Sequence, residues 1–214
     1  MISIILLAPP AGGKGTISGI ISNNLNIPHI STGDLLRREM EEESEIGINI
    51  KEKMESGKLI SDNIIYSLLE KRLSNKDCNN GYILDGFPRN INQALEYEKI
   101  INKLGVKNIV ILLDTKKEVC IKRVTGRLSC KNCGRVYNIY TNLKPINDNT
   151  CDTCNIPLTK RSDDNIETYE IRYNEYISKT TPLINYYKEK GILYTFDGNN
   201  DEISNDILEF LKEF

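Results

Sequence analysis

The sequence lacks any apolar stretch that approaches the ~20 residues needed to cross a bilayer, which argues against a membrane-spanning protein. The apolar run that opens the chain, residues 2–8, has no basic residue before it and is too short for a secretory signal. We therefore expect a soluble, cytoplasmic protein with no membrane partner, and we interpret the opening run as a buried strand.

A strong charge of either sign is also missing, because the formal net charge is −2 at pH 7 over 214 residues. A protein that coats nucleic acid non-specifically needs a positive excess, so nucleic acid is not an expected partner. Histidine is nearly absent: His29 is the only one, and nothing in the sequence resembles a nucleophile paired with a general base. We expect a packing or polar role for it.

Short apolar runs alternate with helical patterns along the chain. Runs at 2–7, 81–85, 107–114 and 192–196 are typical of strands buried on both faces, and 27–30 is a shorter candidate. This alternation predicts an α/β fold, a parallel sheet of about five strands flanked by helices, with ligands beyond the carboxyl ends of the strands. Residues 126–163 break the rhythm and are interpreted as an insertion. Helical patterns are expected at about 14–25, 34–43, 61–74, 90–103, 116–125, 165–189 and 202–213.

The segment LLAPPAGGKGT follows the first predicted strand and opens the first predicted helix. It is similar to a phosphate-binding loop, in which backbone N–H groups, the helix dipole and a lysine attract an anion. Ala8 replaces the first glycine of that pattern. The loop more closely resembles the G-x-P-G-x-G-K-G-T loop of nucleoside monophosphate kinases, in which both Ala8 and Ala11 replace glycines, and alanine costs about 1 kcal/mol where the backbone needs a positive φ. Gly15 removes the hydroxyl that usually binds Mg²⁺, so we expect a metal held mostly by phosphates and water. The alternative is an ordinary turn with a surface lysine.

Two further motifs place side chains that suit anions. In ISTGDLLRR, Ser31 or Thr32 is predicted to cap a helix, and Arg37, one turn in, is placed to reach an anion. In LDGFPRN, Asp85 ends a buried strand, where a carboxylate can orient Mg²⁺-bound water, and Arg89 follows a tight exit. The structural alternatives are a capped helix in the first motif and a surface turn in the second.

Arginine is scarce and selectively placed, because only 9 of the 28 basic residues are arginine. A guanidinium group grips phosphate oxygens at two points, which favours a phosphate-binding role for arginines that lie in motifs. Surface ion pairing is the alternative, and we expect it for Arg38, Arg72 and Arg135. The motif-linked arginines are Arg37, Arg89, Arg123, Arg127, Arg161 and Arg172.

Four of the six cysteines form two C-x-x-C pairs with 17 residues between them. This spacing is typical of tetrahedral zinc, and four thiolates leave no open position, so the site would be structural. Two disulfides are the alternative, which a cytosolic setting disfavours. Cys78 and Cys120 are expected to be small buried hydrophobes. The predicted zinc ligands are Cys130, Cys133, Cys151 and Cys154.

Together these motifs resemble those of adenylate kinase, in the correct order from about residue 1 to the final helix. The match includes the phosphate loop, S-T-G-D-x-x-R, D-G-F-P-R with Gln93, R-x-x-x-G-R, and the later pair Arg161 and Arg172. The resemblance implies a Mg²⁺-dependent phosphotransferase that moves the terminal phosphoryl group of ATP reversibly to AMP, giving two ADP. It also implies a phosphate-loop sheet with a helical monophosphate-binding insertion and, as in several adenylate kinases, a small zinc-binding lid.

The resemblance assigns roles to residues that match its motifs. The implied catalytic residues are Lys14, Arg89, Arg123, Arg127, Arg161 and Arg172. The implied ATP-binding residues are Ala11, Gly12, Gly13, Lys14, Gly15, Thr16, Arg127, Val136, Tyr137 and Asn200. The implied AMP-binding residues are Thr32, Arg37, Lys58, Leu59, Ile60, Gly86, Phe87, Pro88, Arg89, Gln93, Arg161 and Arg172. Asp85 would hold Mg²⁺ through water, and zinc would be structural.

The resemblance also implies three parts: a core of 1–30, 61–125 and 165–214, a mobile AMP-binding part at 31–60, and a zinc-stapled lid at 126–164. A lid must close to exclude water, or ATP would be hydrolysed. We expect a monomer that acts on ATP, AMP and ADP.

Two other functions stay open at this point. The first is a kinase of the same architecture acting on GMP, UMP or CMP, although the amide of Gln93 favours adenine. The second is a zinc-ribbon ATPase that binds nucleic acid, because residues 126–161 hold six Lys or Arg against two Asp. Aromatic residues are sparse in that segment, which weighs against the second.

Overall fold

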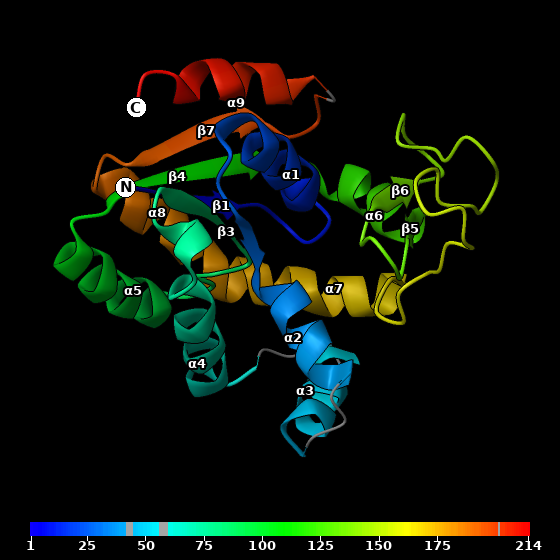
Figure 1. The fold of residues 1–214 in the computed structure, drawn as a ribbon, viewed down its shortest axis with the longest axis horizontal. Helices are drawn as coiled ribbons and strands as arrows, with labels where there is room; N and C mark the ends of the chain where they lie inside the picture. The colour runs from blue at the N-terminus through cyan, green and yellow to red at the C-terminus, as the bar shows by residue number, and fades with distance from the viewer. Residues whose placement is uncertain (42–44, 56–59, 201) are drawn as a thin grey trace.

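The computed structural model describes residues 1–41, 45–55, 60–200 and 202–214. Its centre is a five-stranded sheet in the order β2-β3-β1-β4-β7, and every neighbouring pair is parallel (Figure 1). This confirms the predicted α/β fold; the runs expected at 27–30 and 192–196 begin one or two residues later. The strands are β1 (Ile2–Leu7), β2 (His29–Ser31), β3 (Gly81–Asp85), β4 (Lys107–Asp114) and β7 (Leu193–Asp197).

Helices cover both faces of the sheet, close to the predicted positions. One helix, α3, is missing from the helical patterns, although the resemblance implies a helical insertion there; Gly47 and Asn49 weaken its helical propensity. It is held by tertiary packing, since it packs against α2 and buries Ile50 completely in the core. The helices are α1 (Lys14–Leu25), α2 (Thr32–Glu41), α3 (Glu45–Glu55), α4 (Asp62–Leu73), α5 (Ile91–Leu104), α6 (Lys117–Thr125), α7 (Ile166–Glu175), α8 (Thr181–Glu189) and α9 (Ile203–Leu211).

The single helix expected at 165–189 is interrupted. A π-helical segment, Tyr176–Thr180, separates α7 from α8. Pro182 lies in the first turn of α8, where its missing N–H costs least. The interruption therefore lies directly before Pro182, which has no N–H to continue the regular helical hydrogen bonds.

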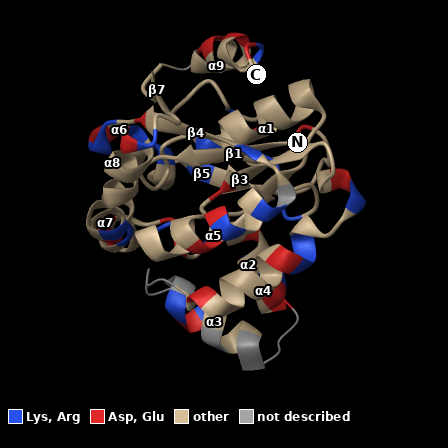
Figure 2. Ribbon diagram, turned by 90° about the vertical axis from the view of Figure 1, so that its left-hand side faces the viewer, with Lys and Arg blue, Asp and Glu red and all other residues tan. Residues whose placement is uncertain are grey.

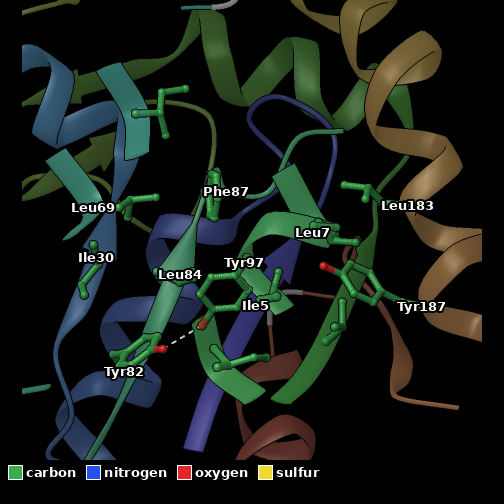
Figure 3. Packing of buried hydrophobic residues seen from close by; sticks show 14 of the residues in the cluster. Ile5, Leu7, Ile30, Leu69, Tyr82, Leu84, Phe87, Tyr97, Leu183 and Tyr187 are labelled. Atoms are coloured by element: carbon green, nitrogen blue, oxygen red, sulfur yellow. Dashed lines mark hydrogen bonds between the residues drawn. The ribbon is translucent and has the colours of Figure 1, made fainter. Parts of the chain in front are cut away.

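The core consists of two apolar layers, one on each face of the sheet. Ile5 and Leu7 of β1 point into the larger layer, which Figure 3 shows together with Leu84, Tyr97 and Leu183. Side chains alternate along a strand, so residues 4 and 6 of β1 point into the other layer, between the sheet and helices α1 and α9. Burial on both faces explains why β1 is continuously apolar.

Two insertions project from this core (Figure 1). The first contains α2 and α3. The second contains a hairpin of β5 (Arg127–Ser129) and β6 (Val136–Asn138) and the long loops after it. Charged residues lie mainly on the outer helices, while the strands behind them are mostly uncharged (Figure 2). Among the described residues there is no helix with the length and apolar character that crossing a bilayer requires.

The carboxyl ends of the parallel strands meet at one edge of the sheet. Leu6 pairs with Asp85 across β1 and β3, and Asp114 pairs with Asp197 across β4 and β7. The segments that leave these strands are therefore neighbours, although they are far apart in sequence. This edge is where such sheets bind ligands.

Candidate active site

The glycine-rich loop between β1 and α1 has the backbone of an anion-binding loop. Gly13 precedes α1 with a φ of 98°, a conformation that L side chains rarely adopt. The N–H groups that follow it start the helix, point out of its N-terminal end along the axis and have no intrahelical partners. The ammonium group of Lys14 donates to the carbonyl oxygens of Ala8 at 2.9 Å and Pro9 at 3.2 Å, so it lies folded over the loop.

The two alanines that replace glycines differ in their effect. Ala11 has a φ of 59°, the strained left-handed conformation, whereas Ala8 is outside that region. The methyl group of Ala11 packs beside the buried cluster that contains Cys120 and Tyr169, which offsets part of the strain. A side chain on Gly12 would lie 2.8 Å from the Cβ of Ala8, so this loop has no room for a third alanine.

Asp85 and Lys14 form the charged centre of this edge. Burial lowers the pKa of Lys14 to about 8, against the opposing charge of Asp85. Burial would raise the pKa of Asp85, but His29 and Lys14 outweigh it and hold the pKa below its usual value. His29 Nε2 lies 3.4 Å from Asp85 Oδ2, which agrees with the expected polar role. Asp85 is therefore ionised at neutral pH.

The start of α2 lies against the turn that leaves β3. The backbone N–H of Asp34 donates to Ser31 Oγ at 3.2 Å, so Ser31 is the cap. Thr32 donates to the carbonyl oxygen of Asp85 at 3.3 Å. Gly86 has a φ of 81°, and a side chain there would lie 2.8 Å from Thr32 Oγ1. Glycine is therefore required at 86 for space as well as for conformation.

Arg89 is fixed by several hydrogen bonds. Its Nε donates to the carbonyl oxygen of Gly86 at 2.7 Å, and its backbone N–H donates to Gln93 Oε1 at 2.6 Å. Gln93 is buried in the first turn of α5, where its backbone N–H donates to the side-chain oxygen of the cap residue Asn90. The other end of the Gln93 amide donates to Asp62 Oδ1 at 2.5 Å. Both ends of this amide are thus engaged within the protein.

The arginines predicted from the motifs gather at this edge. Burial and the charge of Arg172 lower the pKa of Arg89 to about 10. Burial and the charge of Arg37 lower the pKa of Arg161 to about 10, with Arg127 adding to the effect. Burial lowers the pKa of Arg172 as well. All of these groups stay charged at neutral pH, so they form a concentrated positive field that an anion would relieve.

Three of these arginines are held by carboxylates that we did not predict as site residues. Arg127 donates through two nitrogens to Asp164, and Arg172 donates to Asp163 at 2.8 Å. Arg37 pairs with Asp34 at 2.5 Å on α2. The two adjacent Asp residues at 163 and 164, between two motif arginines, were the signal in the sequence.

The ATP side of the predicted site also comes together. Arg123 Nη1 donates to the carbonyl oxygen of Gly198 at 3.0 Å and lies 3.5 Å from where a side chain on Gly13 would begin. Thr115, not predicted, donates to the carbonyl oxygen of Gly12 at 3.1 Å. A side chain on Gly198 would overlap the Thr115 hydroxyl at 2.0 Å. Asn200 follows in the exposed loop after β7.

The remaining predicted residues fall into three groups. Phe87 is buried between the rings of Tyr66 and Tyr97. Ile60 is buried, while Lys58 and Leu59 lie outside the described residues. The last group is exposed and contains Gly15 and Thr16, in the first turn of α1, and Val136 of β6.

The four paired cysteines converge in the second insertion. All four sulfur atoms lie within 4.8 Å of one another, and Cys133 and Cys151 are 3.7 Å apart. Tetrahedral zinc with bonds of about 2.3 Å requires sulfur atoms about 3.8 Å apart, so the arrangement fits. All six cysteines lie in the described part of the chain, and none forms a disulfide in this structure. The four cysteines can therefore bind a metal.

The two halves of this cluster are built alike. Gly134 and Asn155, each directly after the second cysteine of a pair, have left-handed φ values of 72° and 56°. Each pair closes a tight turn, with N–H donors reaching back to the carbonyl oxygens of Cys130 and Cys151. The Tyr137 hydroxyl contacts Cys151 and accepts from the backbone N–H of Asp152, so its ring faces the cluster.

The comparisons with known proteins agree with this arrangement. A sequence profile of the family described as adenylate kinase matches residues 6–192. The chain is similar to an adenylate kinase of Kosmotoga olearia, 46% identical over 200 residues that cover 93% of each chain. It is 41% identical over 213 residues to an adenylate kinase of Desulforamulus reducens, covering 98% of this chain and 100% of that one. The adenylate kinase of Ruminiclostridium cellulolyticum is 42% identical over 211 residues, 97% and 98% of the two chains.

Proposed function

The chain belongs to the adenylate kinase family, and on this premise we propose that it transfers the terminal phosphoryl group of ATP reversibly to AMP, giving two ADP. The observation that supports this most directly is the gathering of motif arginines beside the phosphate loop at one sheet edge. Two phosphorylated nucleotides bring much negative charge together, and fixed cations hold them in line.

The chemistry asks little else of the side chains. A phosphate oxygen of AMP is already anionic, so no general base is needed to activate it. Phosphoryl transfer depends on alignment and on stabilisation of charge. Both sides of the reaction contain the same kind of phosphoanhydride bond, so we expect it to run in both directions.

On the ATP side, the loop amides and Lys14 would hold the phosphates, with Arg123 and Arg127 beside them. The backbone of Val136 and Tyr137 would lie near the base, opposite the backbone at Asn200. The geometry supports the phosphate assignments more strongly than the base contacts, because Arg123 lies next to the loop.

On the AMP side, Arg37 and Arg89 would bind the phosphate, and Thr32 and Gln93 would lie near the adenine. Gln93 would have to exchange Asp62 for the base, since its amide is fully engaged. This exchange would couple adenine binding to the position of α4, which carries Asp62.

Arg161 and Arg172 would bridge the transferring phosphoryl group. The carboxylate of Asp163 holds Arg172 now, so a phosphate must compete for it. Charge-assisted bonds to phosphate are strong enough to do so, because the phosphate brings more negative charge than one carboxylate.

Mg²⁺ would accompany ATP, with Asp85 holding it through water. The donor set fits this mode: Gly15 offers no hydroxyl, and Asp85 Oδ2 lies 4.0 Å from where a side chain on Gly15 would begin. The ion would neutralise charge on the phosphate oxygens. Asp85 itself is ionised and held by the ring of His29, which keeps it oriented.

We propose that the metal at the four cysteines is zinc and that it staples a lid at 126–164. Adenylate kinases are among the enzymes in which a lid closes over the substrates and excludes water. Residues 31–60 would be the second mobile part, over AMP, around the core of 1–30, 61–125 and 165–214. Burial of Arg127 and Asp164 at the base of the lid supports a hinge between firmly packed parts.

We further propose a cytoplasmic monomer. Six free cysteines suit a reducing compartment. Every residue assigned to a nucleotide comes from one chain, so the site needs no second copy.

The experiment that tests the proposal is a panel of AMP, GMP, UMP and CMP, each with ATP and Mg²⁺, with formation of ADP followed. We expect AMP to be the preferred acceptor. Faster turnover of GMP, UMP or CMP would replace the assigned substrate while keeping the reaction, and ATP consumption without any acceptor would contradict the proposal.

A further inference from the structure

A hydrogen bond joins two parts of the site that are far apart in sequence. The hydroxyl of Thr180 donates to the backbone carbonyl oxygen of Arg89 at 3.0 Å, across 91 positions of the chain. Thr180 is the last residue of the π-helical segment. None of the motifs points to it.

The π-helical segment explains why Thr180 faces the site. The N–H of Thr181 bonds to the carbonyl oxygen of Tyr176, five residues back, so one extra residue is fitted into the turn. In an uninterrupted α-helix, Thr180 would be rotated about 80° from Arg172, and the extra residue reduces this to about 20°. The segment therefore brings Thr180 onto the side of the helix that carries Arg172.

Arg172 and Arg89 are close enough to affect each other electrostatically. Thr180 thus ties the helix that carries one of them to the turn that carries the other. Within that turn, Gln93 holds the N–H of Arg89 and Gly86 holds its Nε. The Thr180 hydroxyl holds the backbone carbonyl oxygen of Arg89, so both backbone polar groups and the Nε of this arginine are hydrogen-bonded.

We propose that Thr180 is a positioning residue, which holds Arg89 in place to bind the AMP phosphate beside Arg172. The inference rests on the proposed function. It assigns a purpose to the π-helical segment, since without the extra residue the hydroxyl would not point at Arg89. Pro182 favours the same irregularity, because it cannot donate to the carbonyl of residue 178.

The test uses Thr180→Val, which keeps the shape and removes the hydroxyl, and Thr180→Ser, which keeps the hydroxyl. Thr181→Val is the matched control, because its hydroxyl makes a local bond, to the carbonyl oxygen of Tyr176 at 3.4 Å, and does not reach Arg89. Steady-state kinetics with each nucleotide varied, calorimetric titration with AMP alone, and thermal unfolding are measured for all three variants.

We expect kcat/KM for AMP to fall by about threefold to tenfold in Thr180→Val, the effect of losing one neutral hydrogen bond. The KM for ATP should stay unchanged, Thr180→Ser should restore the AMP value, and Thr181→Val should match the wild type. An equal loss for both nucleotides, or a normal AMP response in Thr180→Val, would overturn the inference. If the wild type makes no ADP, the proposed function fails, and the AMP titration still decides whether Thr180 positions the binding group.

Discussion

Asp164 accepts two hydrogen bonds from the guanidinium group of Arg127, and its carboxylate is completely buried. Burial would lower the pKa of Arg127, but Asp164 outweighs it and raises the pKa. The pair joins the first strand of the lid to the segment just before α7. In the proposed lid, a buried charge pair at this junction would fix the base and leave the far end to move.

We predict that Asp164→Asn lowers the free energy of unfolding by about 3 kcal/mol, because it leaves a buried arginine without its counter-charge. Urea denaturation measures the loss. Glu209→Gln is the matched control, since the Glu209–Lys212 pair is exposed and should contribute nothing measurable. Equal stability of the two variants would show that the buried pair does not hold the lid's base.

The phosphate loop predicts opposite outcomes for two glycine substitutions. Gly12→Ala places a methyl group 2.8 Å from Ala8 Cβ and 2.9 Å from the carbonyl oxygen of Pro9, so the loop must change shape. Gly19→Ala, in the middle of α1, meets nothing within 4 Å. We expect the first to raise the KM for ATP at least tenfold and the second to stabilise the protein by about 0.5–1 kcal/mol. A normal KM for ATP in Gly12→Ala would contradict the loop's role.

Lys14 should make ATP binding sensitive to alkaline pH. Its pKa of about 8 lies below the ordinary 10.5, so the ammonium group loses its proton as the pH rises through 8. We expect the KM for ATP to rise between about pH 7.5 and 9, and Lys14→Arg to remove this rise because arginine stays charged. The KM for AMP over the same range is the control. The same shift means that the Lys14 contribution to stability increases from pH 8 to 10.5, where the unfolded chain binds more protons.

The cysteine cluster predicts one zinc ion per chain. Removal of the metal should lower the melting temperature, because the lid has only a small apolar cluster around Tyr137 and Leu158 to hold it. Elemental analysis before and after chelation, with thermal unfolding, measures both effects. Cys133→Ser should lose the metal and Cys78→Ser should retain it. Metal-free protein with an unchanged melting temperature would contradict a structural zinc site.

Much of the site could be predicted from the sequence because its parts are local. A strand, a glycine-rich turn and a helix start define the phosphate loop at Gly13 and Lys14 without any tertiary information. The same holds for the cysteine pairs, because the C-x-x-C spacing alone predicts that the four sulfur atoms form a metal site. The positions of Arg37 and Arg89 near the starts of helices could likewise be predicted from the residues next to them in sequence.

The parts that were missed depend on contacts between distant segments. Thr115 and Thr180 look like ordinary threonines, and only the folded chain brings them to Gly12 and Arg89. Helix α3 was missed for the same reason, since packing of Ile50 outweighs its weak local propensity. Local patterns predict the residues proposed to bind the nucleotides; the residues that hold them in place are found only from the folded structure.

The central claim is tested most directly by ³¹P NMR of the protein with ATP, AMP and Mg²⁺. The account predicts that ATP and AMP disappear together while ADP grows, that no inorganic phosphate is released, and that ADP alone gives ATP and AMP. Release of inorganic phosphate with AMP left unchanged would contradict it, because the positive groups at the sheet edge would then not be holding two nucleotides in line.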